Sequence, residues 1–332
     1  MTSIRQILLS FVILTMSANA FALETKTFCM YDPVGKNGPV MTFFSDIKAK
    51  GMGWGLDIQM NAYTDEKVAS NDFKAGVCDG TFLTSILSGA YVPFGGTLDA
   101  VGGINTEKQL NVVLKAITNP KVGKLLTNGK YEMVGTLPVG SVYLFVNDKK
   151  ISSVESFSGK KISVLNEDPQ SLKLANLVGA SPVGTSLTTF SGQFNNGNID
   201  IVPMVALGYN VFELYHGLGE KGGIIDEKLL YGMMQMITRK DSFPADFGQK
   251  MREYILSRVP DIHKMVKDAE AEIPAKYWIR TDAKTKDELA KFKREIRLAL
   301  KTEGVHDPKA LKMLWKIRCS TDPTNSECGT PE

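Results

Sequence analysis

A seven-residue pattern, Phe-x-x-Gly-x-x-Asp, occurs twice in the chain, at residues 73–79 and 194–200. In both copies a helix-like segment precedes the glycine, and a strand-like segment follows the aspartate. Glycine ends a helix readily because it adopts the left-handed backbone conformation that other residues avoid. A unit that recurs at an offset of 121 residues predicts two similar α/β lobes.

Strand-like and helix-like segments alternate within each expected lobe. The expected strands are residues 26–31, 77–83, 141–146, 159–165 and 198–202. The expected helices begin at Pro39 and after the caps Thr64, Asp168 and Ser186. Such alternation is typical of parallel sheets covered by helices on both faces, so we predict an α/β fold.

After residue 240 the pattern becomes helical. Apolar residues recur at helical spacing after Ser242, and residues 285–288 form a capping box ahead of a second amphipathic segment. Residues 276–318 carry thirteen Lys or Arg against six Asp or Glu. This charge is either a docking face for an acidic partner or, more simply, the solvated side of amphipathic helices.

The predicted organisation follows from these segments. It comprises a signal peptide at 1–22, lobe I at 23–140, lobe II at 141–232, a helical return to lobe I at 233–275, and C-terminal helices with a disulfide-stapled tail at 276–332. Strands near 138–145 and 230–238 would cross between the lobes, and the C-terminal helices would pack on lobe I or brace both lobes.

The first residues predict export. Arg5 precedes a ten-residue, mostly apolar run at 7–16, and small residues suited to signal peptidase follow, ending at Ala20 and at Ala22. A membrane anchor or a buried strand is the alternative, but a bilayer span needs about 20 apolar residues. We therefore expect a signal peptide cleaved near Ala20 or Ala22 and a periplasmic mature protein.

Charge and hydropathy exclude two other classes of protein. Thirty-nine Lys and Arg against 36 Asp and Glu give a formal net charge of +3, which is too balanced for a dedicated nucleic-acid binder. No run after residue 23 approaches 18 uninterrupted apolar residues, so we do not expect the mature chain to span a membrane.

The four cysteines form an even set, which suits an oxidising compartment. Cys29 and Cys78 lie in strand-like segments that could be neighbours, and Cys319 and Cys328 enclose a short polar loop. We expect Cys29–Cys78 and Cys319–Cys328 bridges, although four cysteines allow three pairings and buried free thiols are the alternative.

Motifs of catalysis and metal binding are missing from the sequence. It contains no Gly-x-Ser-x-Gly, Cys-x-x-Cys or His-Glu-x-x-His pattern, and His216, His263 and His306 are far apart. We therefore predict no catalytic residues, no cofactor and no metal site. An exported enzyme that uses a pair of cleft carboxylates remains an alternative, because Asp and Glu are plentiful.

Residues 142–200 carry a resemblance to a known family. They contain a strand at 142–145, a Glu-Ser-Phe-Ser-Gly-Lys-Lys-Ile run at 155–162, Leu-Val-Gly-Ala-Ser-Pro-Val at 177–183 and the second Phe-x-x-Gly-x-x-Asp. This order resembles the extracytoplasmic solute-binding proteins of TRAP transporters, the DctP-like family, over roughly residues 26–280.

The resemblance implies a two-lobed type II periplasmic binding protein fold, here with additional C-terminal helices. It also implies capture of a small-molecule solute for a membrane transporter, by hinge closure and without enzymatic activity. Similar chains are sometimes labelled as efflux-associated. A soluble periplasmic adaptor of a drug-efflux system, docked through the basic C-terminal helices, is therefore the second functional hypothesis.

In an open α/β sheet, ligands bind beyond the carboxyl ends of the strands, where helix N-termini present free N–H groups. We therefore expect the ligand to contact polar and aromatic residues that follow strands, although Asp168 also fits a simple helix cap. The candidates are Tyr31, Asp32, Lys36, Thr84, Ser85, Ser163, Asn166, Glu167, Asp168, Gln170, Met204 and Tyr209.

Ser163 stands where members of this family usually carry an arginine that grips the substrate carboxylate. Asp32, Glu167 and Asp168 would repel an anion, so the sequence favours a neutral or cationic ligand. The alternative is that Lys36 or Lys161 replaces the missing arginine.

Overall fold

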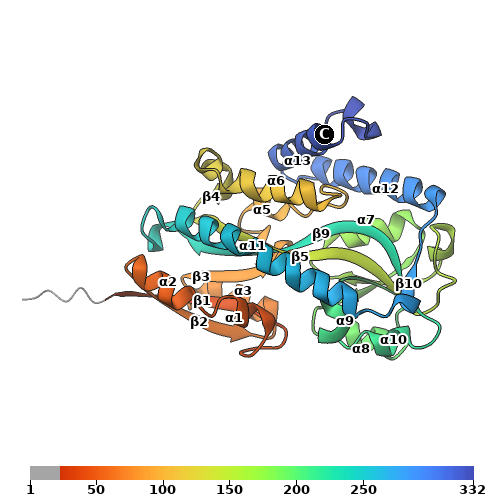
Figure 1. Cartoon of the computed structure of the whole chain (residues 1–332), viewed down its shortest axis with the longest axis horizontal. Coiled ribbons are helices and arrows are strands. Elements are labelled where there is room, and N and C mark those ends of the chain that lie inside the picture. Colours follow the sequence, from red (N-terminus) through yellow and green to blue (C-terminus); the bar gives the residue numbers. More distant parts are fainter. Residues whose placement is uncertain (1–22) are drawn as a thin grey trace, which may run out of the picture.

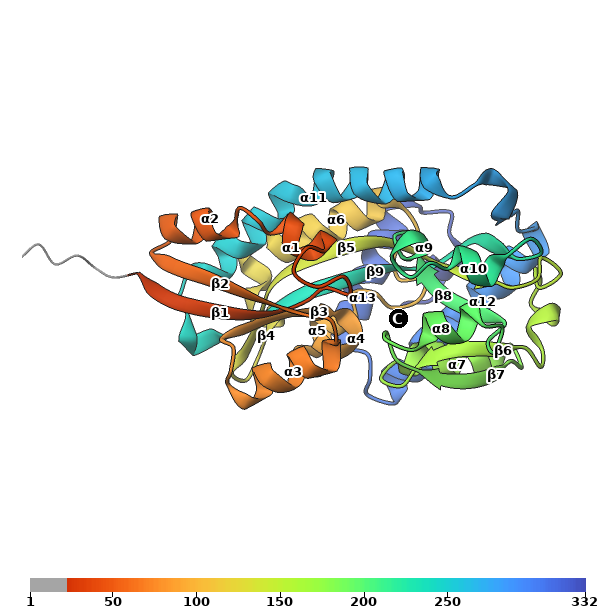
Figure 2. The same cartoon turned by 90° about the horizontal axis from the view of Figure 1, so that it is seen from below.

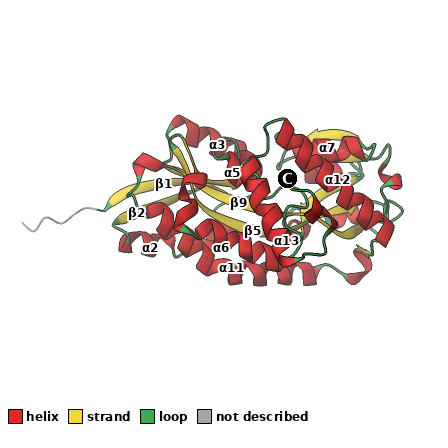
Figure 3. Cartoon of the chain, turned by 90° about the horizontal axis from the view of Figure 1, so that it is seen from above, coloured by secondary structure: helices red, strands yellow, loops and turns green. Residues whose placement is uncertain are grey.

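The computed structural model describes residues 23–332, so the expected signal peptide lies outside the described residues. One ten-stranded sheet runs through both lobes, in the order β2-β1-β3-β9-β5-β8-β6-β7, with β10 (Trp278–Ile279) added to β9 and β4 (Thr127–Asn128) to β5. Helices lie on both faces of this sheet (Figure 1, Figure 3). The α/β class predicted from the sequence is confirmed.

Lobe I holds one edge of the sheet. Its strands β1 (Glu24–Tyr31), β2 (Leu56–Tyr63) and β3 (Gly80–Thr84) pair in parallel around a core rich in phenylalanine. Its helices are α1 (Pro39–Phe43), α2 (Ile47–Gly53), α3 (Glu66–Ala75), α4 (Ser85–Ser88), α5 (Pro93–Gly96) and α6 (Glu107–Thr118).

Lobe II holds the other edge. Its parallel strands are β6 (Lys161–Leu165), β7 (Ser181–Thr185) and β8 (Ile201–Val205). Its helices are α7 (Pro169–Leu177), α8 (Phe190–Asn195), α9 (Gly208–Val211) and α10 (Tyr215–Leu218). Two apolar clusters of the lobe pack around the strands, one including α7 and the other α8 to α10.

Two long strands join the lobes. β5 (Tyr131–Val146) and β9 (Gly223–Arg239) pair antiparallel along most of their lengths and pass from one lobe into the other (Figure 2). The sheet is therefore mixed rather than purely parallel, because these two strands connect the lobes in opposite directions. The expected boundaries at 140/141 and 232/233 fall inside β5 and β9.

Helix α11 (Phe247–Glu272) lies along β5 where that strand crosses between the lobes (Figure 1). Glycines allow this close approach. A Cβ at Gly135 would come within 2.1 Å of Ile255 Cδ1, and one at Gly140, whose φ is +105°, within 3.0 Å of Val266 Cγ1. Larger residues at these two positions would push α11 away from the crossing strand.

The two C-terminal helices brace both lobes. α12 (Ala283–Thr302) packs on α7 of lobe II, whereas α13 (Pro308–Thr321) packs on α6 of lobe I. Leu289, Ile296 and Leu300 of α12 accordingly belong to a lobe II core cluster, and Leu311 and Leu314 of α13 to the lobe I cluster. This arrangement is one of the two that the sequence allowed.

Both expected disulfides are present. Cys29 of β1 is bonded to Cys78, which lies directly before the neighbouring strand β3, with a Cα–Cα distance of 5.8 Å. Cys319 near the end of α13 is bonded to Cys328, at a Cα–Cα distance of 5.5 Å. Each bridge joins segments that the secondary structure already brings together.

Several helix starts differ from the predictions. Asp65, not Thr64, caps α3, because its carboxylate accepts the free N–H groups of Lys67 and Val68. A charged carboxylate also interacts favourably with the positive end of the helix dipole. Helix α8 begins after Thr189 rather than at Ser186, whereas Asp168 caps α7 as predicted. Asp282 caps α12 ahead of the predicted capping box.

Candidate functional site

A cavity of about 170 Å³ lies between the two lobes, and we call it the inter-lobe cavity. Lobe I contributes the end of β3 and the start of α4, and lobe II contributes the end of β6, the start of α7 and β8. The crossing strands β5 and β9 form its base through residues such as Val142 and Met233. The cavity is therefore walled by residues of both lobes and of the strands that join them.

Most of the lining is apolar. It includes Val101, Val142, Leu165, Leu187, Phe190, Leu229, Leu230 and Met233. The polar members are Thr84, Ser85, Asp99, Ser163, Asp168, Gln170 and Ser171. None of the described residues that line it is lysine, arginine or histidine. A polar group of a bound molecule would therefore meet hydroxyls, one amide and two carboxyls.

Asp99 lines the inter-lobe cavity from lobe I, and its carboxyl group is buried. It lies in the loop between α5 and α6, only 6% exposed, and its Oδ2 accepts a hydrogen bond from the Ser85 hydroxyl. Burial, together with the charge of the Asp168 carboxylate, raises the pKa of Asp99 to about 7. Asp99 thus changes charge near neutral pH.

Asp168 and Gln170 bring lobe II to the cavity. The Asp168 side chain accepts the Gln170 backbone N–H as the N-cap of α7, and burial raises the pKa of Asp168. Gln170 Oε1 accepts the backbone N–H of Val101 in lobe I at 2.9 Å. This hydrogen bond connects the lobes beside the cavity.

A second, smaller cavity of about 110 Å³ adjoins the first and contains Asn166 and Glu167. Lys67 of α3 forms a 3.2 Å ion pair with Glu167 across the two lobes. Deeper in, Glu66 accepts the backbone N–H of Thr84, and burial raises the pKa of Glu66 to about 7. The Thr84 hydroxyl is buried and has no hydrogen-bond partner among residues 23–332.

Ser163 faces the inter-lobe cavity from β6. It is 4% exposed, and its hydroxyl lies 2.8 Å from the Thr185 hydroxyl of β7. The position that carries an arginine in the resembling family thus holds a small neutral side chain at the cavity wall. Lys36 and Lys161, the proposed replacements, are exposed and do not line the cavity.

The structure brings together half of the predicted ligand residues in this cavity, namely Thr84, Ser85, Ser163, Asp168, Gln170 and Met204. Tyr31, Asp32, Lys36 and Tyr209 lie outside both cavities. Asp32 is fully buried and accepts the backbone N–H groups of Val34, Val40 and Met41 at 3.0, 2.8 and 3.1 Å. Its carboxylate therefore holds its own turn and the start of α1.

The other predicted ligand residues outside the two cavities lie in the cores of the lobes or on the surface. Tyr31 is buried at the end of β1, and Tyr209 packs with Tyr215 and Tyr277 in a lobe II cluster. Lys36 is exposed in the turn before α1. Strand ends alone did not reveal which side chains point to the cavity.

Sequence reasoning missed Asp99 and the apolar lining. Asp99 belongs to no motif, but it lies between Leu98 and Ala100 in a mostly apolar segment. A lone carboxyl in such a segment was a signal of burial. Burial of a carboxyl requires a partner or a shift of its pKa, so such a residue is a candidate for a functional site.

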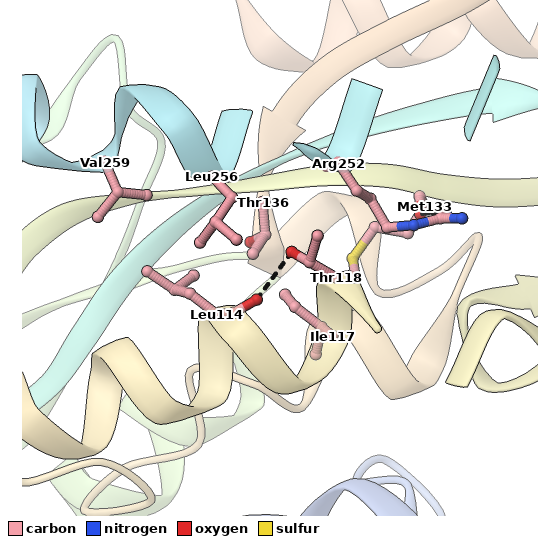
Figure 4. Close-up of a pocket in the computed structure, with 9 residues that line it drawn as sticks. Leu114, Ile117, Thr118, Met133, Thr136, Arg252, Leu256 and Val259 are labelled. Atoms are coloured by element: carbon pink, nitrogen blue, oxygen red, sulfur yellow. Dashed lines mark hydrogen bonds between the residues drawn. The ribbon is translucent and has the colours of Figure 1, made fainter. Parts of the chain in front are cut away.

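A smaller pocket lies under α11, and Figure 4 shows it between Leu114, Ile117 and Thr118 of α6, and Leu256 and Val259 of α11. Its volume of about 10 Å³ leaves room for at most one water molecule. It is a packing gap in the core of lobe I rather than a binding site.

We expect Asp99→Asn to stabilise the protein more at pH 8 than at pH 5. The pKa of Asp99 rises from its usual 3.8 to about 7 on folding, so the folded protein keeps a proton that the unfolded chain has released. For a raised acid pKa, stability is greatest below about pH 4 and falls as the pH rises to about 7. Asparagine does not titrate, and its amide oxygen still accepts the Ser85 hydroxyl.

Between pH 5 and pH 7 the ionisation of Asp99 spans about two pKa units. This corresponds to a loss of roughly 2–3 kcal/mol in the free energy of unfolding of the unmodified protein. Urea unfolding of both proteins at pH 5 and pH 8 measures this difference. An equal effect of the substitution at the two pH values would show that Asp99 has an ordinary pKa.

In residues 23–332 no helix combines the length and the apolar character required to cross a bilayer. The same residues contain no group of three His, Cys, Asp or Glu side chains placed to hold a metal ion.

Comparison with known proteins identifies relatives that match most of the chain. The family described as solute-binding protein AdeT 1/2 matches residues 42–332. The probable solute-binding protein AdeT1 of Acinetobacter baumannii is 38% identical over 299 residues, covering 90% of this chain and 98% of that protein. The probable solute-binding protein AdeT2 of the same organism is 29% identical over 233 residues, covering 70% and 98%.

Solved structures with the same fold include TRAP periplasmic solute-binding proteins. One from Desulfovibrio salexigens, with bound orotic acid, has a TM-score of 0.74 at 12% identity, covering 89% of this chain and 99% of the other. The periplasmic ectoine-binding protein of a Halomonas elongata TRAP transporter has a TM-score of 0.71 at 12% identity, covering 90% and 100%. At this identity the likeness shows the fold, and it confirms the two-lobed periplasmic binding architecture.

Proposed function

The chain belongs to the AdeT 1/2 family of solute-binding proteins, and from this membership we propose that it captures a small solute in the inter-lobe cavity and delivers it to a membrane transporter. The observation that carries the proposal is the position of the cavity, which is walled by both lobes and floored by the strands that join them. A solute there contacts both lobes only when they are closed, so binding shifts the open–closed equilibrium towards closure.

Contacts between the lobes support this mechanism. The Gln170–Val101 hydrogen bond and the Lys67–Glu167 ion pair both join lobe I to lobe II beside the cavity. An exposed ion pair contributes only ~0.2–1 kcal/mol and a hydrogen bond ~0.5–1.5 kcal/mol, so these contacts are weak enough to break when the solute leaves. The two disulfides suit an oxidising compartment, and with the expected signal peptide they favour the periplasm as the place of capture.

The alternative adaptor role depends on free positive charge on the C-terminal helices. Three of the thirteen basic residues at 276–318 are buried and paired within the chain, since Lys293 pairs with Glu227, and Arg297 and Arg318 both pair with Glu332. Others, such as Lys309, Lys312 and Lys316 of α13, are exposed, so the adaptor role is the second candidate function. We favour solute capture over it because the cavity between the lobes offers a site for a solute.

Calorimetric titration with a metabolite library tests the proposal, after native mass spectrometry of the purified protein for any retained solute. Trp278 packs edge-on against Tyr143 of β5, with ring centroids 5.1 Å apart, so its fluorescence reports on the strand that joins the lobes. We expect saturable binding without turnover and a smaller radius of gyration on binding. Turnover of a bound compound would instead support an exported enzyme.

We expect malate, succinate and sugar acids to bind no more tightly than about 1 µM. An arginine fork bonded to a carboxylate contributes ~1.5–3 kcal/mol, so its absence at Ser163 weakens such ligands by ~10–150-fold. Calorimetry with the unmodified protein measures this. Sub-micromolar binding of any of the three would contradict the prediction.

The Ser163→Arg variant provides the structural control. Because Ser163 faces the cavity, we expect the far-ultraviolet circular dichroism spectrum of the variant to match that of the unmodified protein. A lost or altered spectrum would mean that the position is part of the packed core instead.

A further inference from the structure

We propose that the inter-lobe cavity takes a small amphipathic cation, with one amine between the carboxylates of Asp99 and Asp168 and an apolar body on the remaining walls. The proposal rests on the solute-binding function and adds the chemical class of the solute. Each lobe then contributes one carboxylate that binds the amine, because Asp99 lies in lobe I and Asp168 in lobe II.

The charges around the cavity support a cation. Its only charged lining residues among those described are Asp99 and Asp168, and the Asp168 carboxylate contributes to the raised pKa of Asp99. Two carboxylates that line one cavity from opposite lobes repel when both are ionised. An ammonium group between them removes this repulsion, whereas an anion increases it.

Hydroxyl groups of the cavity lining can accept hydrogen bonds from the amine of the solute. The Thr84 hydroxyl is buried without a partner in residues 23–332, and it lines the cavity beside Ser85. A buried hydroxyl without a partner costs free energy, which a bound polar group would recover. An ammonium has three N–H donors and no acceptor, so carboxylate and hydroxyl oxygens can satisfy all of them.

The remaining walls define the body of the solute. Val142, Leu165, Phe190, Leu230 and Met233 offer aliphatic and aromatic surface with no charge. A buried apolar cavity of about 150 Å³ in another protein holds benzene. The 170 Å³ here therefore suits one ring, or an aliphatic body of similar size, that carries a short amine arm.

Three probes with one ring and different head groups test the class. Benzylamine, benzyl alcohol and benzoate are titrated calorimetrically at pH 8, where Asp99 is largely ionised. Charge-assisted hydrogen bonds are about twice as strong as neutral ones, so we expect benzylamine to bind at least about tenfold more tightly than benzyl alcohol. We expect benzoate to bind more weakly than either.

Variants assign the effect to the carboxylates. Asp99→Asn should weaken benzylamine at least about tenfold and leave benzyl alcohol within about threefold, because only the charge is lost. Asp57→Asn removes one negative charge from β2 of lobe I, away from the cavity, and should change neither affinity. Asp168→Asn provides a second test from lobe II if Asp99→Asn fails to fold.

Three outcomes overturn the proposal: no binding of benzylamine, equal or tighter binding of benzoate, or benzylamine affinity unchanged in a folded Asp99→Asn or Asp168→Asn protein. These results leave solute capture itself standing. Solute capture fails by a different result, namely that no member of the metabolite library produces saturable binding.

Discussion

Replacing Glu332 with alanine is expected to lower the free energy of unfolding by about 3–5 kcal/mol, because it leaves buried guanidinium groups short of a partner. The Glu332 carboxylate is enclosed by α12 and α13. Arg297, fully buried, donates from Nη2 at 2.6 Å, and Arg318, 1% exposed, donates from Nη2 at 2.8 Å. Among residues 23–332, Glu327 would then be the one remaining carboxylate partner of both arginines.

The shifted pKa of Glu332 is consistent with an ionised carboxylate that pairs with the two buried arginines. Burial alone would raise the pKa of its side-chain carboxyl, but the hydrogen bonds and charges of Arg297 and Arg318 hold that pKa below its ordinary value. Glu332 therefore remains ionised at neutral pH. The ion pairs stabilise the native packing because the arginines are already buried, not because such pairs are strong in general.

Urea unfolding followed by the fluorescence of Trp315 measures the loss, since this residue lies in α13 and its Nε1 donates to the Glu327 carbonyl. Glu295→Ala is the matched control, because Glu295 is exposed on α12. We expect the control to change stability by less than about 0.5 kcal/mol. A loss below about 1 kcal/mol for Glu332→Ala would contradict the argument.

The second large effect concerns the two disulfides, which should differ in their contributions. A crosslink restricts the unfolded chain more when it closes a longer loop. The Cys29–Cys78 bridge spans 49 residues and Cys319–Cys328 spans 9. The chain-entropy model then gives about 4 kcal/mol for the first and about 2.6 kcal/mol for the second.

Pairwise alanine substitution of each bridge, with unfolding measured under non-reducing conditions, tests this order. Removal of the Cys29–Cys78 bridge also truncates two fully buried side chains in lobe I, which adds to its cost. An equal or greater loss of stability from removal of the Cys319–Cys328 bridge would contradict the loop-length argument.

Features set by local sequence could be predicted. The repeated Phe-x-x-Gly-x-x-Asp indicated two lobes, and both its glycines, Gly76 and Gly197, have the positive φ expected of a helix end. Asp168 followed by Pro169 predicted the start of α7, because a capping carboxylate and a proline suit the first turn. The Cys29–Cys78 pairing could also be predicted, because both cysteines lie in or next to strand-like segments that are neighbours in the sheet.

Features set by distant contacts could not be predicted. The antiparallel pairing of β5 and β9 depends on how two segments about 90 residues apart meet, and a strand pattern gives no direction. Asp32 and Asp99 are both buried carboxyls, yet one satisfies backbone N–H groups and the other faces the cavity. Only the position of each side chain in the folded protein separates these roles.

The division of the C-terminal helices between the lobes bears on the cost of binding. Because α12 packs mainly on lobe II and α13 on lobe I, we expect the lobes to separate by bending of the short turn between these helices or by sliding of one helix. Gly304, with φ of +75°, lies in that turn. A receptor tethered in this way samples fewer open arrangements than one joined by strands alone, so it gives up less conformational entropy when it closes on its solute.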